Sequence, residues 1–263
     1  MAGKNLVELC ASSLEAVEEA FRLGYAIVVF DQRVSGASVS KTMDLSALKS
    51  RFAAAKEKLY ECPLDNIRER RLLSRVTIVS EGPRLDVPRP LMTFFDIIAV
   101  EVGDAAALAK ACDDVNVDVV SLPVSTNNIF RAPVLSLQKR KACFELTYAS
   151  TSLRRLVSLA ARLCDLSRCK NIVFSSAARD AISQHAPRDA RNLAICLGFQ
   201  PMPHLVLQRA AQRRRATPLR ADPRTLNLPA LFEENIHKRK RTQQGVLHSY
   251  KEDKSRMNLI RNN

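Results

Sequence analysis

The chain has 263 residues, of which 46% are hydrophobic, and a formal net charge of +14. This length allows one large hydrophobic core, or a core followed by a tail. No apolar run approaches the roughly 18 residues that a membrane helix requires, and the N-terminus lacks the apolar stretch of a signal peptide. We therefore expect a soluble intracellular protein.

Eight short apolar runs predict strands. In chain order they cover residues 5–10, 25–30, 75–80, 95–100, 117–122, 133–137, 143–147 and 171–175. Continuous Val and Ile runs, such as Phe95–Val100 and Val117–Leu122, are typical of strands buried on both faces. Strands of this kind indicate a parallel sheet with helices packed outside it.

Helical patterns separate most of these runs. The expected helices begin at Ser12 or Ser13, at Ser46, shortly after Val100, at Ser152 and at Pro187. Gly24 and Gly198 stand where the first and last of them should end. Several connections between strands are short or lack a helix, so the order of elements predicts an irregular TIM-like (β/α) barrel of the α/β class.

The positive charge is concentrated at the C-terminal end. Residues 204–263 hold 14 Lys and Arg against 5 Asp and Glu. Hydrophobic periodicity fades beyond Pro203, which predicts a barrel domain over 1–203 and a basic, largely disordered tail over 204–263. Such a tail suits nucleic acid or another anionic surface, and a tail that only aids solubility is the alternative.

The seven cysteines are odd in number and scattered, at Cys10, Cys62, Cys112, Cys143, Cys164, Cys169 and Cys196. They form no Cys-x-x-Cys pair, and no histidine lies at zinc-finger spacing from one. This indicates reduced, mostly buried thiols. A disulfide between Cys164 and Cys169 is the alternative to positions on a helix face and in a turn.

The sequence lacks the motifs of a self-sufficient enzyme site. Its histidines are His185, His204, His237 and His248, and they form no His-x-His cluster of the kind that metal-dependent barrel phosphoesterases place after their first strand. The glycines form neither a dinucleotide-binding nor a P-loop motif, and a Gly-x-Ser-x-Gly elbow is missing. These absences point away from catalysis by the chain itself.

Four acidic residues lie in or beside predicted strands, namely Asp31, Asp96, Asp118 and Glu145. A buried Glu145 could act as a general acid or base. Because no partner stands at a recognisable spacing, a structural salt bridge is the favoured interpretation. The same interpretation applies to Asp118.

The last predicted strand runs into Ser175-Ser176-Ala177-Ala178-Arg179. In a parallel barrel, backbone N–H groups at this position lie at the C-terminal rim, where they can hold a phosphate. We expect Ser175, Ser176 and Arg179 to do so. A simple cap, in which Ser176 satisfies its own turn, is the alternative.

Several motifs occur together in one order. They are Leu23-Gly24-Tyr25, Ser74–Ile78, Phe95–Val100, Val117–Val120, Phe144–Tyr148, Lys170–Ala178, and Pro187, Asp189, Asn192 and Leu193 of the last helix. On these motifs, the stretch from Leu14 to Gly198 resembles the thirty-kilodalton (p30) protein subunit of ribonuclease P and ribonuclease MRP. The departures are His185 where the family has arginine, Lys141 where it has glycine, and a shorter loop after Tyr148.

The resemblance implies an irregular TIM-like barrel that binds the catalytic RNA in a multi-protein particle. Its partners would be that RNA, a small αβ-sandwich protein and other protein subunits. It implies no catalytic residue, metal or cofactor on this chain, because the RNA hydrolyses the phosphodiester with its own Mg²⁺. The expected role is that of an accessory subunit in tRNA 5′-leader processing, extending to rRNA processing, in the nucleus and its nucleolus. Membership of ribonuclease P or of ribonuclease MRP is left open.

Cations in the matched region are the candidates for contact with RNA. Together with Ser175 and Ser176, they are Lys139, Arg140, Lys141, Arg154, Arg155, Lys170, Arg179, Arg188 and Arg191. For each cation, a solvated surface charge is the alternative. Candidates for nuclear import are Arg213, Arg214, Arg215, Lys238, Arg239, Lys240 and Arg241.

Two other functions are weighed against the RNA-binding subunit. The first is a barrel phosphoesterase that binds its own metals, for which hydrolysis by the isolated chain would be diagnostic. The second is a protein-only assembly factor in ribosome production, which crosslinking to RNA would exclude.

Overall fold

The structure, a computed structural model, describes residues 6–36, 45–61, 70–80, 85, 87–122, 129, 131–149 and 152–216. The chain divides into Met1–Arg220 and Ala221–Asn263, and every described residue belongs to the first part. No helix in the described residues is long and apolar enough to cross a bilayer.

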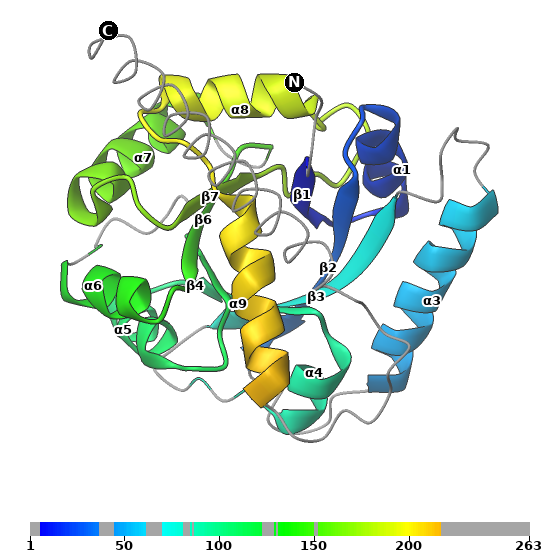
Figure 1. The fold of residues 1–263 in the computed structure, drawn as a ribbon, viewed down its shortest axis with the longest axis horizontal. Helices are drawn as coiled ribbons and strands as arrows, with labels where there is room; N and C mark the ends of the chain where they lie inside the picture. Colours follow the sequence, from blue (N-terminus) through cyan, green and yellow to red (C-terminus); the bar gives the residue numbers. More distant parts are fainter. Residues whose placement is uncertain are drawn as a thin grey trace, which may run out of the picture. The chain divides into compact units, whose positions relative to one another are not determined.

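The described strands form one parallel sheet that curls into a barrel (Figure 1). They are β1 (Val7–Ala11), β2 (Ile27–Ser35), β3 (Arg71–Ser80), β4 (Ile97–Val102), β5 (Val119–Ser121), β6 (Cys143–Thr147) and β7 (Ile172–Ser175). Neighbours in the sequence are neighbours in the sheet, from β1 to β7. A single bridge between Ala11 and Ala178 joins the two edges. The predicted irregular TIM-like barrel is therefore confirmed.

Helices follow the strands on the outside of the sheet, except for the last helix, which lies across one end of the barrel (Figure 1). They are α1 (Leu14–Arg22), α3 (Leu45–Glu61), α4 (Arg89–Phe94), α5 (Ala105–Asp113), α6 (Arg131–Lys139), α7 (Leu153–Ser167), α8 (Pro187–Cys196) and α9 (Pro203–Ala216). The Ser13 hydroxyl accepts the N–H of Ala16 at 3.1 Å, so Ser13 caps α1. Gly24 and Gly198 follow the ends of α1 and α8 with φ of 100° and 94°, a conformation that favours glycine.

Side chains alternate between the two faces of each strand. On β3, Val76 and Ile78 belong to the hydrophobic cluster that the outer helices cover. Arg75 and Thr77 alternate with them along the strand, so they point into the barrel. Both faces are buried, and this explains the continuous apolar runs in the sequence.

The strand predicted over 133–137 is wrong, because this segment forms helix α6. Pro133, Val134 and Leu137 are buried while Leu135 is exposed, which is the spacing of one helix face. Proline is tolerated in the first turn of a helix, whereas in a central strand it removes a hydrogen bond of the sheet. The described barrel therefore has seven strands where eight were expected.

The predicted domain boundary at residue 203 also needs correction. Residues 203–216 form helix α9, in which Val206, Leu207 and Ala210 are buried. Figure 1 shows α9 crossing the barrel. The N–H of Met202, just before α9, donates to the carbonyl of Ile172 at the start of β7, so this is the end where the strands begin. Helix α9 is therefore part of the folded domain and does not belong to a disordered tail.

Candidate nucleic-acid interface

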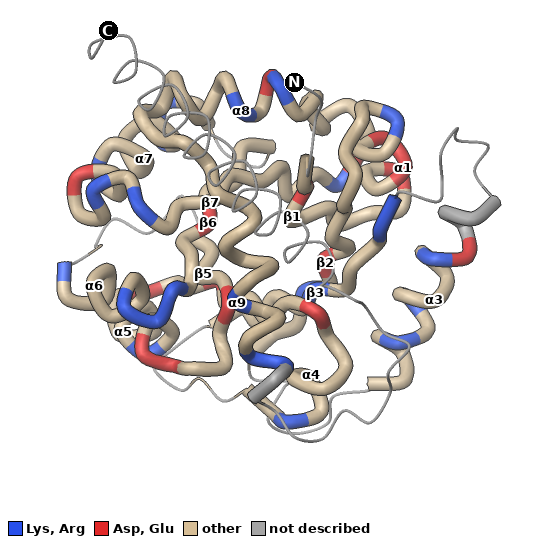
Figure 2. Tube along the Cα trace, viewed as in Figure 1, with Lys and Arg blue, Asp and Glu red and all other residues tan. Residues whose placement is uncertain are grey.

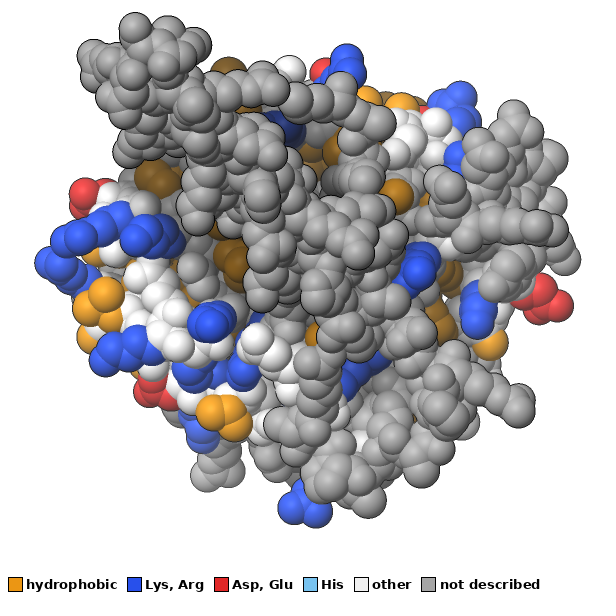
Figure 3. All heavy atoms as spheres, viewed as in Figure 1, with side chains coloured by type: hydrophobic (Ala, Val, Ile, Leu, Met, Phe, Trp, Pro, Cys, Tyr) orange, Lys and Arg blue, Asp and Glu red, His pale blue; other side chains and the backbone are white. Residues whose placement is uncertain are grey.

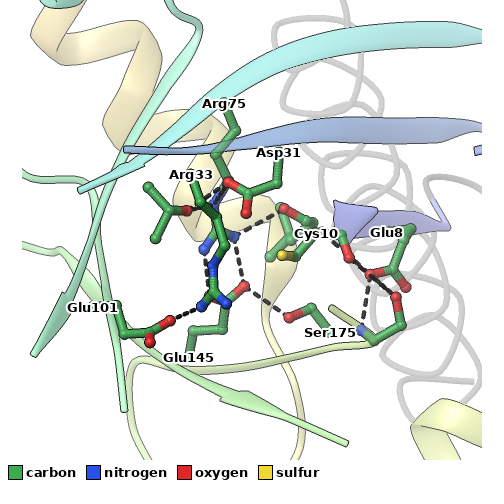
Figure 4. A network of polar contacts seen from close by, with 11 residues as sticks. Glu8, Cys10, Asp31, Arg33, Arg75, Glu101, Glu145 and Ser175 are labelled. Carbon is green, nitrogen blue, oxygen red and sulfur yellow. Dashed lines mark hydrogen bonds and ion pairs between the residues drawn. The ribbon is translucent and has the colours of Figure 1, made fainter. Parts of the chain in front are cut away.

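An ion pair fills the middle of the barrel (Figure 4). The guanidinium of Arg75 on β3 donates to both carboxylate oxygens of Glu145 on β6, at 2.6 and 2.5 Å. It also donates to the carbonyl of Leu9 on β1, at 2.9 Å. Strands β3 and β6 are not neighbours in the sheet, so this pair spans the interior. The predicted salt bridge of Glu145 is confirmed.

A second carboxylate completes this network. Asp31 on β2 lies 3.2 Å from Nε of Arg75 and accepts the hydroxyl of Thr77 at 2.5 Å. The hydroxyl of Ser175 on β7 donates to Glu145 at 2.7 Å. Burial by itself would raise the pKa of Glu145, but the charge and hydrogen bonds of Arg75 outweigh it and lower that pKa.

The charged side chains of this interior network are buried, although a TIM barrel usually carries its active site at the C-terminal ends of its strands. The side chains of Arg75, Asp31 and Glu145 are each at most 1% exposed. An ion pair between Arg33 and Glu101, from β2 and β4, is more exposed than this network. Within the described ranges, no group of three or more His, Cys, Asp or Glu side chains is arranged to hold a metal ion.

A separate polar cluster closes the seam between β1 and β7. Oε1 of Glu8 accepts the backbone N–H of Ser176 at 2.9 Å and its hydroxyl at 3.0 Å, while Oε2 accepts the Gln184 amide at 3.1 Å. Burial raises the pKa of Glu8, and these hydrogen bonds oppose the rise. Glu8 therefore joins the two edge strands where an eighth strand is missing from the described sheet.

This arrangement corrects the expected roles of Ser175 and Ser176. Both serines are fully buried, and the N–H of Ser176 is donated to Glu8. The hydroxyl of Ser176 also accepts the N–H of Ala178 at 3.1 Å, which is the cap that the sequence left as the alternative. Neither serine is open to a phosphate. Arg179, next in the predicted motif, is exposed.

The cationic candidates divide between the two ends of the barrel. Helices α7 and α8 begin where β6 and β7 end, so their first turns lie at the C-terminal rim together with the loop after β7. The exposed arginines of these segments are Arg154, Arg155, Arg179, Arg188 and Arg191, which we call the rim arginines. Figure 2 shows basic positions on α7 and α8. Among the described residues, no ion pair or hydrogen bond engages their guanidinium groups.

The other candidates, Lys139, Arg140, Lys141 and Lys170, lie at the end where the strands begin. Figure 3 shows Lys and Arg side chains over α5, α6 and α7. Arg140 is half-buried and donates to the carbonyl of Ala111 at 3.2 Å, and burial together with the charge of Arg209 lowers its pKa. Lys141 has a φ of 60°, a conformation in which glycine is less strained. This explains the glycine that the resemblance leads one to expect there.

The import candidates do not form a free basic run. Arg213 is 4% exposed, and its Nε donates to both oxygens of Asp118, at 3.1 and 2.9 Å. Arg214 forms an ion pair with Asp96. In the folded protein these two arginines are structural, so the expected import role does not suit them. Arg215 ends the same run within α9, and 238–241 lies outside the described residues.

Three contributors to the polar interior and the rim were not predicted from the sequence. Arg75 was not singled out, although a cation within an apolar strand is a sign of a buried ion pair. Glu8 lies within the strand predicted over 5–10 and was given no role of its own. His185 was noted as a departure, and its ring stacks on Tyr148 with centroids 4.6 Å apart. Nothing in the sequence places these two rings together.

The chain is therefore a TIM-like barrel protein. In its described part, buried side chains fill the interior, and arginines lie on the C-terminal rim. Residues 9–203 match the RNase P subunit p30 family, and the chain belongs to that family.

The chain is also similar to two relatives and, in its fold, to one solved structure. Ribonuclease P protein subunit p30 of Mus musculus is 27% identical over 199 residues, covering 70% of this chain and 71% of the mouse protein. Protein GAMETOPHYTE DEFECTIVE 1 of Arabidopsis thaliana is 27% identical over 176 residues, or 64% of this chain, which spans only 28% of that protein. A chain in the cryo-EM structure of archaeal ribonuclease P with mature tRNA has the same fold. Its TM-score is 0.56 at 14% identity, over 84% of this chain and 95% of the archaeal one.

Proposed function

We propose that this chain is a non-catalytic subunit that binds and supports the catalytic RNA of ribonuclease P during removal of tRNA 5′ leaders. Its membership of the p30 family supports the role of a ribonuclease P subunit. The solved particle that contains a chain of this fold also contains mature tRNA. A role in ribonuclease MRP and rRNA processing, a small αβ-sandwich protein partner, and residence in the nucleus and nucleolus belong to the same proposal.

The filled barrel supports a non-catalytic role. A hydrolase that acts through a carboxylate or a metal needs that group to reach its substrate. Here Glu145 and Asp31 are held by Arg75, and their side chains are at most 1% exposed. Exposing either carboxylate to a substrate would break its buried ion pair with Arg75. The competing function, a metal-dependent phosphoesterase, would require such an exposure.

The rim arginines are the observation that carries the RNA-binding part of the proposal. Five exposed guanidinium groups lie at one end of the barrel, and no described acid pairs with them. Arginine binds phosphate in a bidentate manner, which an exposed lysine cannot do. Arg154 and Arg155 also stand in the first turn of α7, where the helix dipole disfavours a cation. Phosphate groups of an RNA backbone would remove this penalty.

The test compares two triple variants that remove the same charge. Changing Arg179, Arg188 and Arg191 together to alanine should weaken RNA binding by about 3 kcal/mol, at roughly 1 kcal/mol for each charged hydrogen bond. The matched control changes Lys139, Lys141 and Lys170 at the other end of the barrel. It should weaken binding only slightly at the same salt concentration.

Binding to ribonuclease P RNA is measured by filter retention, and folding by thermal melting. Exposed charges contribute little to folding, so both variants should melt close to the wild type. Equal losses in the two variants would show that only bulk charge matters. Wild-type affinity of the rim variant would place the RNA elsewhere.

A further inference from the structure

The ring of His185 is held in place at the C-terminal rim. It stacks on the ring of Tyr148 at a centroid distance of 4.6 Å and an angle of 28°. Tyr148 is buried, whereas His185 is exposed. One face of the imidazole therefore lies against Tyr148, while the residue as a whole is exposed.

Two tyrosine hydroxyls fix the backbone of the same residue. The N–H of His185 donates to the hydroxyl of Tyr148 at 3.2 Å, and its carbonyl accepts the hydroxyl of Tyr25 at 3.2 Å. Burial raises the pKa of both tyrosines, so both hydroxyls keep their protons, the Tyr25 hydroxyl as donor and the Tyr148 hydroxyl as acceptor toward His185. These contacts use only backbone atoms of His185. The ring can thus be replaced without removing its support.

The loop that carries His185 is braced along its length. The N–H of Ser12 donates to the carbonyl of Ala178 at 2.9 Å, and the side chain of Gln184 reaches Glu8 at 3.1 Å. The N–H of Ser183 donates to Asp180 at 2.8 Å. A loop fixed in this way loses little conformational freedom when it binds a ligand.

We propose that His185 is a stacking platform for an unpaired nucleobase of the bound RNA. This inference rests on the proposed function and adds that the rim binds RNA in its single-stranded form. Single-stranded RNA is recognised by bases that stack on exposed aromatic rings, histidine included, with cations holding the neighbouring phosphates. Arg179 lies in the same loop and Arg188 in the first turn of α8, so the ring and the cations share one part of the rim.

A protein partner is the competing occupant of this loop. Ile182 is 95% exposed, and an exposed aliphatic side chain suits a protein surface. The arginines and the ring face favour RNA, because a single exposed isoleucine is common on protein surfaces. Ile182 therefore provides a control in the same loop.

The experiment uses the full chain and a single-stranded RNA of about ten nucleotides that contains one 2-aminopurine. The same sequence in a duplex is the comparison. His185→Ala should weaken single-strand binding roughly ten-fold or more and abolish the quenching of 2-aminopurine that stacking causes. His185→Phe keeps an aromatic face and should retain both binding and quenching. Ile182→Ser should bind RNA like the wild type, and duplex binding should be the same for all variants.

The other outcomes would each contradict a different part of the proposal. Wild-type affinity and quenching in His185→Ala would overturn the stacking platform while leaving RNA binding by the rim intact. Equal losses in His185→Phe and His185→Ala would show that the ring face is not the contact. If Ile182→Ser alone loses assembly into the particle while RNA binding by His185→Ala is unchanged, the loop docks a protein. A wild-type chain that binds neither RNA would overturn both this inference and the proposed function.

Discussion

Glu8 and Glu145 are both buried carboxylates, but their surroundings differ in charge. Glu145 faces the guanidinium of Arg75, which donates two short hydrogen bonds to it. Glu8 accepts hydrogen bonds from Ser176 and Gln184, which are neutral donors. The charge and hydrogen bonds of Arg75 outweigh burial and lower the pKa of Glu145, whereas burial outweighs the neutral donors and raises the pKa of Glu8, in both cases from the ordinary value of 4.5. The two groups should therefore give opposite pH dependences of stability.

Unfolding in urea between about pH 2 and pH 8 tests this difference. Glu145 loses its proton more readily in the native protein, so its stabilisation is complete above the ordinary pKa and is lost as pH falls through the lowered one. Glu145→Gln should be about 3 kcal/mol less stable than the wild type near pH 7, with a smaller difference in acid. Glu8 keeps its proton longer in the native protein, so its contribution falls as pH rises above the ordinary pKa. Glu8→Gln should gain stability relative to the wild type as pH rises.

Parallel pH profiles of the two variants would contradict the assigned environments. Gln184 can accommodate the Glu8→Gln change, because its amide oxygen is buried without a described partner and a flip would turn it toward the new amide.

The structural roles of some buried residues could be predicted from the sequence, but their partners could not. The structural role of Glu145 followed from its place inside an apolar strand. Its partner did not, because Arg75 is 70 residues away and on a strand that is not adjacent in the sheet. Contacts across a barrel interior depend on closure of the whole sheet, which no local pattern encodes. The same reason hid the contact between Glu8 and Ser176.

Among the helices and strands, the wrong predictions concern two segments whose secondary structure depends on tertiary packing. The run Pro133–Leu137 is short and apolar, and a run of that length fits a buried strand as well as a helix face. Helix α9 has a basic sequence with weak periodicity, so its pattern suggested a tail. It belongs to the fold because three apolar residues and one arginine of this helix are buried.

Arg213 should anchor α9 to the barrel. It pairs with Asp118 and donates to the carbonyls of Met92 and Asp96, at 3.1 and 3.0 Å. Arg213→Ala leaves Asp118 buried without its charge partner and should destabilise the protein by about 3–5 kcal/mol. Arg51→Ala, at an exposed position of α3, should change stability by less than about 0.5 kcal/mol. Chemical denaturation measures both variants, and equal stabilities would show that α9 is not held by this contact.

In the whole fold, one set of ion-paired charges lies inside the barrel, whereas the rim arginines lie on its surface. The charges inside the barrel are neutralised by one another, as in the pair of Arg75 and Glu145. The rim arginines lie outside with no described counter-charge. Composition and motif order predicted the basic surface and the barrel. They could not predict which cations share an end, because that depends on where each helix begins around the closed sheet.

We propose that this chain belongs to a ribonuclease P whose catalysis resides in RNA. The most direct measurement is 5′-leader removal from precursor tRNA by the particle purified through a tag on this chain, before and after digestion of its RNA with a nuclease that is then inactivated. We expect leader removal by the intact particle and none after digestion. Leader removal that survives digestion and is lost on changing Asp31 or Glu145 would contradict the claim and identify the barrel itself as the enzyme.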